Sequence, residues 1–258
     1  MQDDNLLELN CNSDEARTAL HKAFSGLPQA VDLFLVGGAV RNALFRIFHG
    51  QVLTQRDYDQ VITRGSEDYK EYLAGLGYVG RPYPSHQDKQ VAYSKALNEK
   101  AQEGDSYVNW LVFDMHTVDG TTIEDNLKYN VAFTINGCAV KANDLFTKPW
   151  QECLIQAFPS SLDDIKNKKL QLNYDGYKSQ PSYFYSVLRF MSAGFAPPPK
   201  VEVDLLLHEL PRIEHARFER NVKKVYDYVG GEEKARSLVK SLGIDIDVFD
   251  EAIVKSKL

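Results

Sequence analysis

The chain has 258 residues, of which 43% are hydrophobic and 26% charged, and its formal net charge is −6. This length suits one large domain or two small ones, and the acidic balance means that a nucleic-acid partner would have to bind a local basic patch. No apolar stretch approaches 18 residues, the N-terminus lacks a signal-peptide pattern, and the three cysteines form no CxxC motif, which predicts a cytoplasmic protein without a membrane span or structural zinc.

Strand and helix patterns are mixed over about the first 140 residues. Strands are expected at 33–36, 57–63, 90–94 and 108–114, with a strand-rich stretch at 131–140. Helices are expected at 14–25, 39–48, from 66 to about 75, and within 121–129. The first of these helices has a capping sequence, Ser13-Asp14-Glu15. Such a mixture predicts an α/β head.

The pattern becomes helical after about Leu162. Helices are expected at 162–170, 182–195, 201–210, 216–229 and 232–242, and Ala196-Pro197-Pro198-Pro199 separates two of them. The predicted fold class is therefore α+β, with a mixed-sheet head over residues 1–145 and an all-helical domain over residues 146–258.

Two motifs near the start of the chain predict a site for phosphate and metal. Gly37 and Gly38 follow a strand pattern and open a helix, where backbone N–H groups and the helix dipole favour phosphate, and Arg41 can add a charged contact. Asp57 and Asp59 would point to the same face of a strand and could bind magnesium. An isolated Asp-x-Asp more often marks a polar strand end, and the glycines upstream favour the metal site.

A third carboxylate belongs to a neighbouring strand pattern. Asp114 ends the apolar run Trp110–Phe113, where it could complete a metal site or accept the proton of an attacking hydroxyl. A strand-terminal aspartate in a turn is an equally good interpretation. Asp119 and Asp125 are rival candidates for the third carboxylate.

Four segments together resemble a known family. LVGGAVRN, RDYDQVI, TIEDNLKYNVAFTINGCAV and SYFYSVLRFMSAGF occur in that order, as do the corresponding segments of the bacterial-type tRNA nucleotidyltransferase (CCA-adding enzyme) and poly(A) polymerase family. The resemblance covers roughly residues 30–195. It implies a polymerase-β-like head, two Mg²⁺ ions, and transfer of NMP from CTP or ATP to an RNA 3′ end. It also implies that Asp57 and Asp59 are catalytic metal ligands, with Asp114 at the position of the third carboxylate.

The chain departs from this family in its base-selecting segments. Asn42 replaces the aspartate of the family's VRD, and Asn130-Val131-Ala132 replaces RRD. The neck's E-D-x-x-R aligns with residues 179–183, so that Gln180 and Tyr183 could still hydrogen-bond or stack, and Arg189 is retained. Residues expected to bind nucleotide are Gly37, Gly38, Arg41, Gln180, Tyr183 and Arg189.

The sequence therefore predicts a template-independent nucleotidyltransferase that uses two Mg²⁺ ions and adds NMP to an RNA 3′ end, with tRNA as the first candidate acceptor. Two alternatives stay open. One is a catalytically quiet module that binds RNA or nucleotide, and the other is an NMP transferase that acts on a protein or a small molecule. The preferred nucleotide and the oligomeric state are not predicted.

Overall fold

The computed structural model describes residues 6–55, 57–83, 90–99, 101, 109–118, 121–176, 182–209 and 226–255. The chain divides into two compact units. The first comprises residues 1–129 and 136–162, and the second comprises residues 130–135 and 163–258. The chain therefore enters the second unit briefly at 130–135, returns to the first, and enters the second again after Leu162.

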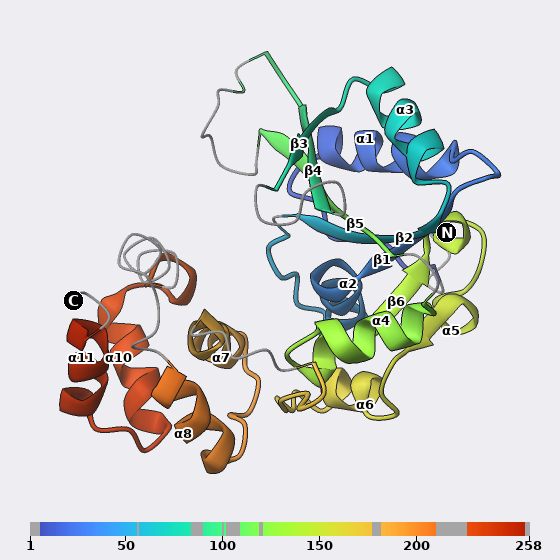
Figure 1. Cartoon of the computed structure of the whole chain (residues 1–258). Helices are drawn as coiled ribbons and strands as arrows, with labels where there is room; N and C mark the ends of the chain where they lie inside the picture. Colours follow the sequence, from blue (N-terminus) through green and yellow to red (C-terminus); the bar gives the residue numbers. More distant parts are fainter. Residues whose placement is uncertain are drawn as a thin grey trace. The chain divides into compact units, whose positions relative to one another are not determined.

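A mixed sheet forms the centre of the first unit (Figure 1). Its described strands are β1 (Asp32–Val36), β2 (Tyr58–Arg64), β3 (Val79–Pro82), β4 (Gln90–Ala96), β5 (Trp110–Thr117), β6 (Cys138–Lys141) and β7 (Leu154–Gln156). Their order across the sheet is β3-β4-β5-β2-β1-β6-β7. β2 and β5 run parallel, and the other neighbouring strands pair antiparallel.

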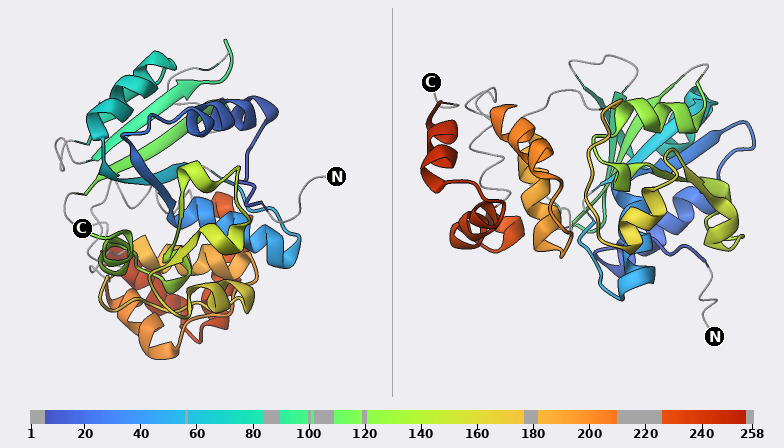
Figure 2. Two further views of the ribbon diagram at one scale, coloured as in Figure 1. Left: turned by 90° about the vertical axis from the view of Figure 1, so that its right-hand side faces the viewer. Right: turned by 90° about the horizontal axis from the view of Figure 1, so that it is seen from below.

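The helices of the first unit are α1 (Asp14–Ser25), α2 (Gly37–His49), α3 (Ser66–Gly75), α4 (Ile123–Asn130), α5 (Trp150–Cys153) and the start of α6 (Ser161–Lys166). Figures 1 and 2 show α1 and α3 on one face of the sheet and α2 on the other. Phe24 of α1 stacks on Phe113 of β5 at 5.4 Å between ring centroids, and Tyr69 of α3 donates to Gln60 Oε1 of β2 at 3.0 Å. These contacts bury the face of the sheet that Gln60 and Phe113 share.

Residues of β5 alternate between buried and partly exposed. Leu111, Phe113 and Met115 are buried, whereas Asp114 and His116 are partly exposed. Successive side chains of a strand point to opposite faces, so the buried set faces α1 and the other set faces away from it. The face that carries Asp114 is therefore only partly covered.

The structure confirms most expected elements and corrects several. The Ser13 side chain accepts from the Ala16 N–H at 3.1 Å and caps α1, as predicted. The strand-rich stretch expected at 131–140 is confirmed only at its end, because Thr134–Asn136 form a short 3₁₀ helix and β6 begins at Cys138. β3, α5, β7 and α11 (Ile246–Lys255) were not expected from the sequence. Most of the helix expected at 216–229 lies outside the described residues.

The second unit is helical in its described part. It contains α7 (Ser182–Ser192), α8 (Lys200–Glu209), α10 (Glu232–Ser241) and α11 (Ile246–Lys255). The rings of Phe184 in α7 and Phe249 in α11 lie 5.8 Å apart, and both side chains are buried. None of the described helices is both long and apolar enough to cross a membrane.

The contacts place the end of the first unit later than the expected boundary between residues 145 and 146. Residues 146–162 belong to the first unit because β7 pairs with β6, with Val140 opposite Leu154. Residues 130–135, expected in the head, belong to the second unit, where Phe133 pairs with Leu172 and the Asn173 N–H donates to the Ala132 carbonyl at 2.8 Å.

Candidate active site

The glycine turn and the aspartate pair lie against each other in the first unit. Gly37 begins α2 with a φ of 59°, and a Cβ added to it would lie 3.3 Å from Asp59 Oδ2. The backbone N–H of Gly38 donates a hydrogen bond to the Asp59 carboxylate. The start of α2 and the catalytic candidate Asp59 therefore form one site, and a side chain at position 37 would crowd it.

Asp114 lies beside Asp59 because their strands are parallel neighbours. The two residues are direct partners in the β2–β5 register, so their side chains share a face of the sheet. Asp57 precedes β2 and stands two residues before Asp59. The negative charges of Asp57 and Asp114 act on Asp59 and raise the pKa of its carboxyl. All three predicted carboxylates are thus close enough to interact.

Burial is the largest cause of the pKa shift at Asp59. Together with the charges of Asp57 and Asp114 it raises the pKa of Asp59 to about 7, while the Arg41 guanidinium and the Gly38 N–H oppose the rise. Negative charge therefore exceeds positive charge at this position. A site of this kind favours protons or cations near the carboxylates.

Asp114 is held by two residues that the sequence analysis missed. Tyr83 donates to Asp114 Oδ2 at 3.0 Å, and Gln90 Nε2 donates to Asp114 Oδ1 at 3.3 Å. Burial raises the pKa of Asp114 above its ordinary value, and these two hydrogen bonds and the charge of His116 oppose the rise. Tyr83 and Gln90 carry no motif, and only the β3–β4 and β4–β5 pairing brings them to Asp114.

Arg41 is buried against asparagine side chains. Its exposed fraction is 6%, its Nε and one terminal nitrogen donate to Asn42 Oδ1 at 3.2 and 2.9 Å, and its other terminal nitrogen donates to Asn136 Oδ1. Asn42 Nδ2 in turn donates to Gln55 Oε1 at 2.9 Å. The predicted phosphate-binding arginine thus has a fixed place beside Asp59, and Asn136 and Gln55 are further residues that the sequence did not single out.

The donor set suits a hard divalent cation, although no complete metal cluster is preformed. Mg²⁺ prefers carboxylate oxygens, and positive charge would relieve the repulsion from Asp57 and Asp114 that adds to burial in raising the pKa of Asp59. Within the described part of the chain, however, no group of three or more His, Cys, Asp or Glu side chains is arranged to hold a metal ion. Hydrogen bonds from Tyr83 and Gln90 already engage both oxygens of Asp114.

The rival candidates for the third carboxylate differ in position. Asp125 is an exposed residue in the first turn of α4 and does not belong to a strand. Its backbone N–H donates to the Thr122 hydroxyl at 3.1 Å. Asp119 lies outside the described residues. Of the described candidates, Asp114 is the one that the sheet register places beside Asp59.

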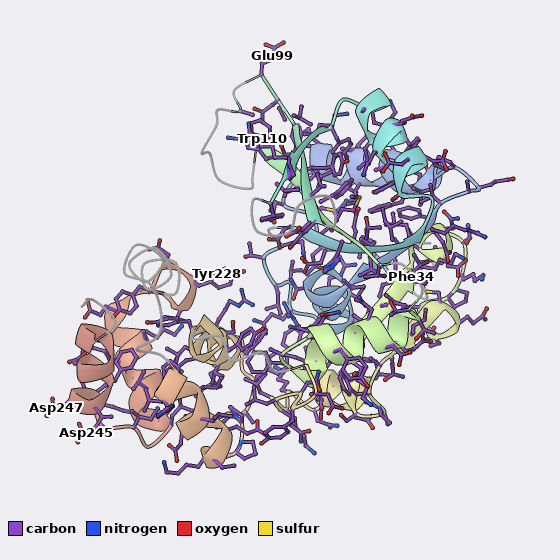
Figure 3. All side chains as sticks on the ribbon, in the orientation of Figure 1. Phe34, Glu99, Trp110, Tyr228, Asp245 and Asp247 are labelled. Atoms are coloured by element: carbon purple, nitrogen blue, oxygen red, sulfur yellow. The ribbon has the colours of Figure 1, made fainter. Side chains whose placement is uncertain are left out.

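Two of the predicted base-binding residues are described in the second unit. Tyr183 is partly buried, and its ring lies 6.0 Å from that of Phe133. The Arg189 guanidinium lies over the rings of Phe190 and Tyr228 at 5.1 and 5.3 Å; Tyr228 is labelled in Figure 3. Gln180 lies outside the described residues. Each of the two described side chains therefore lies near aromatic rings of the same unit, and their role in base binding stays a prediction.

No protein-family model matches the chain, and no curated protein sequence matches it either. Solved structures do match. A Thermotoga maritima CCA-adding enzyme complexed with tRNA is 17% identical with a TM-score of 0.61, and the match covers 90% of this chain and 52% of that one. A CCA-adding enzyme with ATP gives 18% identity and a TM-score of 0.62 over 91% of this chain and 55% of the other. The complex of a CCA-adding enzyme with CTP is 18% identical with a TM-score of 0.59, over 90% and 52%.

These matches confirm the predicted fold class, a mixed-sheet head followed by a helical body, which the chain shares with the CCA-adding enzymes. The chain spans about half the length of the solved structures that it matches. At 17–18% identity, the likeness establishes the architecture alone.

Proposed function

We propose that this protein is a nucleotidyltransferase that adds NMP from CTP or ATP to an RNA 3′ end, with tRNA as the first acceptor to test. The observation that carries the proposal is that Gly37 lies against Asp59 and that Asp59 and Asp114 are neighbours on the same, partly exposed face of the sheet. A phosphate-binding turn beside acidic residues is the arrangement that phosphoryl-transfer chemistry requires. The fold shared with CCA-adding enzymes supports the choice of substrates.

The residues of this site have distinct roles in the proposed reaction. The N-terminus of α2 and Arg41 bind and orient the triphosphate, because both present positive electrostatic potential next to Asp59. The acceptor hydroxyl oxygen attacks the α-phosphorus, the bond from that phosphorus to the bridging oxygen breaks, and pyrophosphate leaves. Asp114 accepts the hydroxyl proton, a role that its position beside Asp59 in the β2–β5 register favours.

Asp57 and Asp59 would hold Mg²⁺, with Asp114 as the third ligand once its contacts with Tyr83 and Gln90 rearrange. Bound magnesium supplies charge neutralisation for the triphosphate and alignment of the reacting oxygens. The crowding of negative charge around Asp59 is the structural observation that favours such an ion.

The helical unit would supply base recognition in this proposal. Tyr183 and Arg189 offer stacking and hydrogen-bonding groups, and Gln180 is the further candidate from the sequence. The segment 130–132 is uncharged and is used structurally, since Asn173 Nδ2 donates to the Val131 carbonyl at 2.7 Å. We therefore expect a base preference that differs from strict alternation of CTP and ATP.

The test is incorporation of labelled nucleotide into tRNA that lacks its 3′ end, in the presence of Mg²⁺ and with CTP, ATP, GTP and UTP supplied in turn. We expect incorporation by the unmodified protein and its loss, by several orders of magnitude, in the Asp57→Ala, Asp59→Ala double variant. Asp68→Ala, an exposed substitution on α3, is the matched control and should retain activity.

Two other results would replace the proposal. Nucleotide binding without incorporation into any acceptor would indicate a catalytically quiet binding module. Incorporation into a protein or a small molecule, detected by mass spectrometry, would keep the chemistry and exclude RNA as the acceptor. Absence of both incorporation and nucleotide binding would contradict the proposed function altogether.

A further inference from the structure

A chain of buried hydrogen bonds joins Arg41 to the backbone of Asp57. Arg41 donates to Asn42 Oδ1, Asn42 Nδ2 donates to Gln55 Oε1 at 2.9 Å, and Gln55 Nε2 donates to the Asp57 carbonyl. The exposed fractions of Arg41, Asn42 and Gln55 are 6%, 4% and 3%. We call these links the Arg41–Asp57 relay.

The direction of every link in the relay is determined by chemistry. A guanidinium only donates, so the oxygen of the Asn42 amide must face Arg41 and its nitrogen must face Gln55. The oxygen of the Gln55 amide must then accept, which leaves its nitrogen toward Asp57. A backbone carbonyl only accepts, so this nitrogen is the group that the Asp57 carbonyl requires. The amides of Asn42 and Gln55 therefore have only one compatible orientation.

Neighbouring asparagines hold the same segment in place. Asn10 Nδ2 donates to the Leu53 carbonyl at 3.0 Å and to the Asn42 carbonyl at 3.4 Å, and Asn12 Nδ2 donates to the Gln55 carbonyl at 2.6 Å. The segment that leads into Asp57 is thus fastened to α2 and to the N-terminal residues through side-chain amides. Because each donor meets an acceptor, loss of one amide changes the position of its neighbours.

We propose that Asn42 and Gln55 are positioning residues that couple the triphosphate-binding Arg41 to the placement of the catalytic candidate Asp57. The inference rests on the proposed metal-dependent transfer and concerns residues to which that proposal assigns no role. Asn42 is also the position at which the chain departs from the VRD of the family that it resembles. In this chain an aspartate there would be the wrong partner for Gln55.

Asn42→Asp tests the relay because it keeps the shape of the side chain and removes its amide donor, which meets Gln55 Oε1 at 2.9 Å and the Thr54 carbonyl at 3.4 Å. The new carboxylate can still accept from Arg41, but it offers Gln55 only acceptors. Gln55 must then turn its nitrogen toward position 42, which removes the donor from the Asp57 carbonyl. An added negative charge alone would strengthen cation binding, so weaker binding would come from the lost donor, and the same loss in Gln55→Met would assign it to the link with the Asp57 carbonyl.

The measurements are Mn²⁺ affinity, from the electron paramagnetic resonance signal of the free ion, and hydrogen exchange of the backbone amides at 57–59. We expect Asn42→Asp and Gln55→Met to weaken Mn²⁺ binding about 10–100-fold, as for other residues that support metal ligands, and to speed this exchange. Asn143→Asp, an exposed substitution in the same unit, is the matched control and should change neither.

The outcomes separate the relay from the proposed function. Unchanged or tighter Mn²⁺ binding in Asn42→Asp, with unchanged exchange at 57–59, would overturn the relay and leave the proposed function standing. An unmodified protein that binds no Mn²⁺, or whose binding survives the double alanine substitution at Asp57 and Asp59, would overturn both.

Discussion

Asp59 is the residue at which opposing influences on the site meet. Burial and the charges of Asp57 and Asp114 disfavour its ionised form, and Arg41 and the Gly38 N–H favour it. The first group is the stronger, so the folded protein holds a proton on Asp59 at a pH where an unfolded chain does not. The ionised Asp59 carboxylate therefore destabilises the folded state, as is common for groups at functional sites.

Stability should depend on pH through Asp59. Its pKa is about 7 in the folded state and 3.8 ordinarily, so the folded state binds more protons between pH 4 and pH 7 and its stability falls as pH rises through that window. In metal-free buffer, Asp59→Asn should be more stable than the unmodified protein at pH 8, by on the order of 1–3 kcal/mol. The gain should shrink toward pH 4.

The measurement for Asp59 is chemical denaturation across this pH range with a chelator present. Glu71→Gln, which removes an exposed negative charge on α3, is the control and should show no such pH-dependent gain. A difference between Asp59→Asn and the unmodified protein that stays constant from pH 4 to pH 8 would contradict the prediction.

Two local features favour glycine at position 37. Its φ of 59° lies in the left-handed region, and a Cβ would approach Asp59 Oδ2 to 3.3 Å. Gly37→Ala should therefore lower the free energy of unfolding by about 1–2 kcal/mol and reduce nucleotidyl transfer. Gly75→Ala, at the end of α3 with open space around it, is the matched control. Equal stability of the two variants would argue against this role for Gly37.

At the scale of elements, β4 and β5 together build one wall of the site. Gln90, Ala92 and Ser94 of β4 are partly exposed, and Ala92 pairs directly with Asp114. Tyr83 follows β3, and its N–H donates to the Gln90 carbonyl at 3.1 Å. The β3–β4 pair therefore serves as a support that brings two side-chain donors to a single carboxylate.

Removal of one of these donors should shift the titration of Asp114. Tyr83→Phe deletes the hydrogen bond to Oδ2, which stabilises the ionised carboxylate, so the pKa of Asp114 should rise further. Carboxyl ¹³C chemical shifts, followed as a function of pH, measure this change. Tyr129→Phe, at an exposed tyrosine, is the control. An unchanged or lower pKa of Asp114 in Tyr83→Phe would contradict the assigned contact.

On the scale of the whole molecule, the division into units differs from the order of the chain. The sheet is completed by β6 and β7, after the chain has already contributed residues 130–135 to the helical unit. Ala139 pairs with Ile155, so the first unit needs residues beyond position 145. The helical unit likewise uses Thr134, whose hydroxyl donates to Asp164 Oδ2 at 2.7 Å.

Truncation tests this division. A fragment of residues 1–162 retains all seven described strands, whereas a fragment of residues 1–145 loses β7 and exposes the edge of β6. We expect the longer fragment to unfold cooperatively in denaturant and the shorter one to be less stable by several kcal/mol or to aggregate. Comparable stability of the two fragments would favour the earlier boundary.

The sequence by itself predicted the residues of the candidate site and the fold class. Gly37, Gly38, Asp57 and Asp59 carry recognisable spacings because glycine conformation and strand alternation act over a few residues. The change from mixed to helical patterns near Leu162 likewise identified the fold class, which the solved CCA-adding enzymes share. These features depend on neighbours along the chain and can be read from it.

Only the tertiary structure decided which distant residues complete the site. From the sequence, a site carboxylate and a turn residue were equally good interpretations of Asp114. The parallel β2–β5 register places it beside Asp59. Tyr83, Gln90 and Gln55 carry no signal, because a hydrogen bond between residues far apart in sequence depends on strand order and packing. Pairing of Ala139 with Ile155 decided the unit boundary for the same reason.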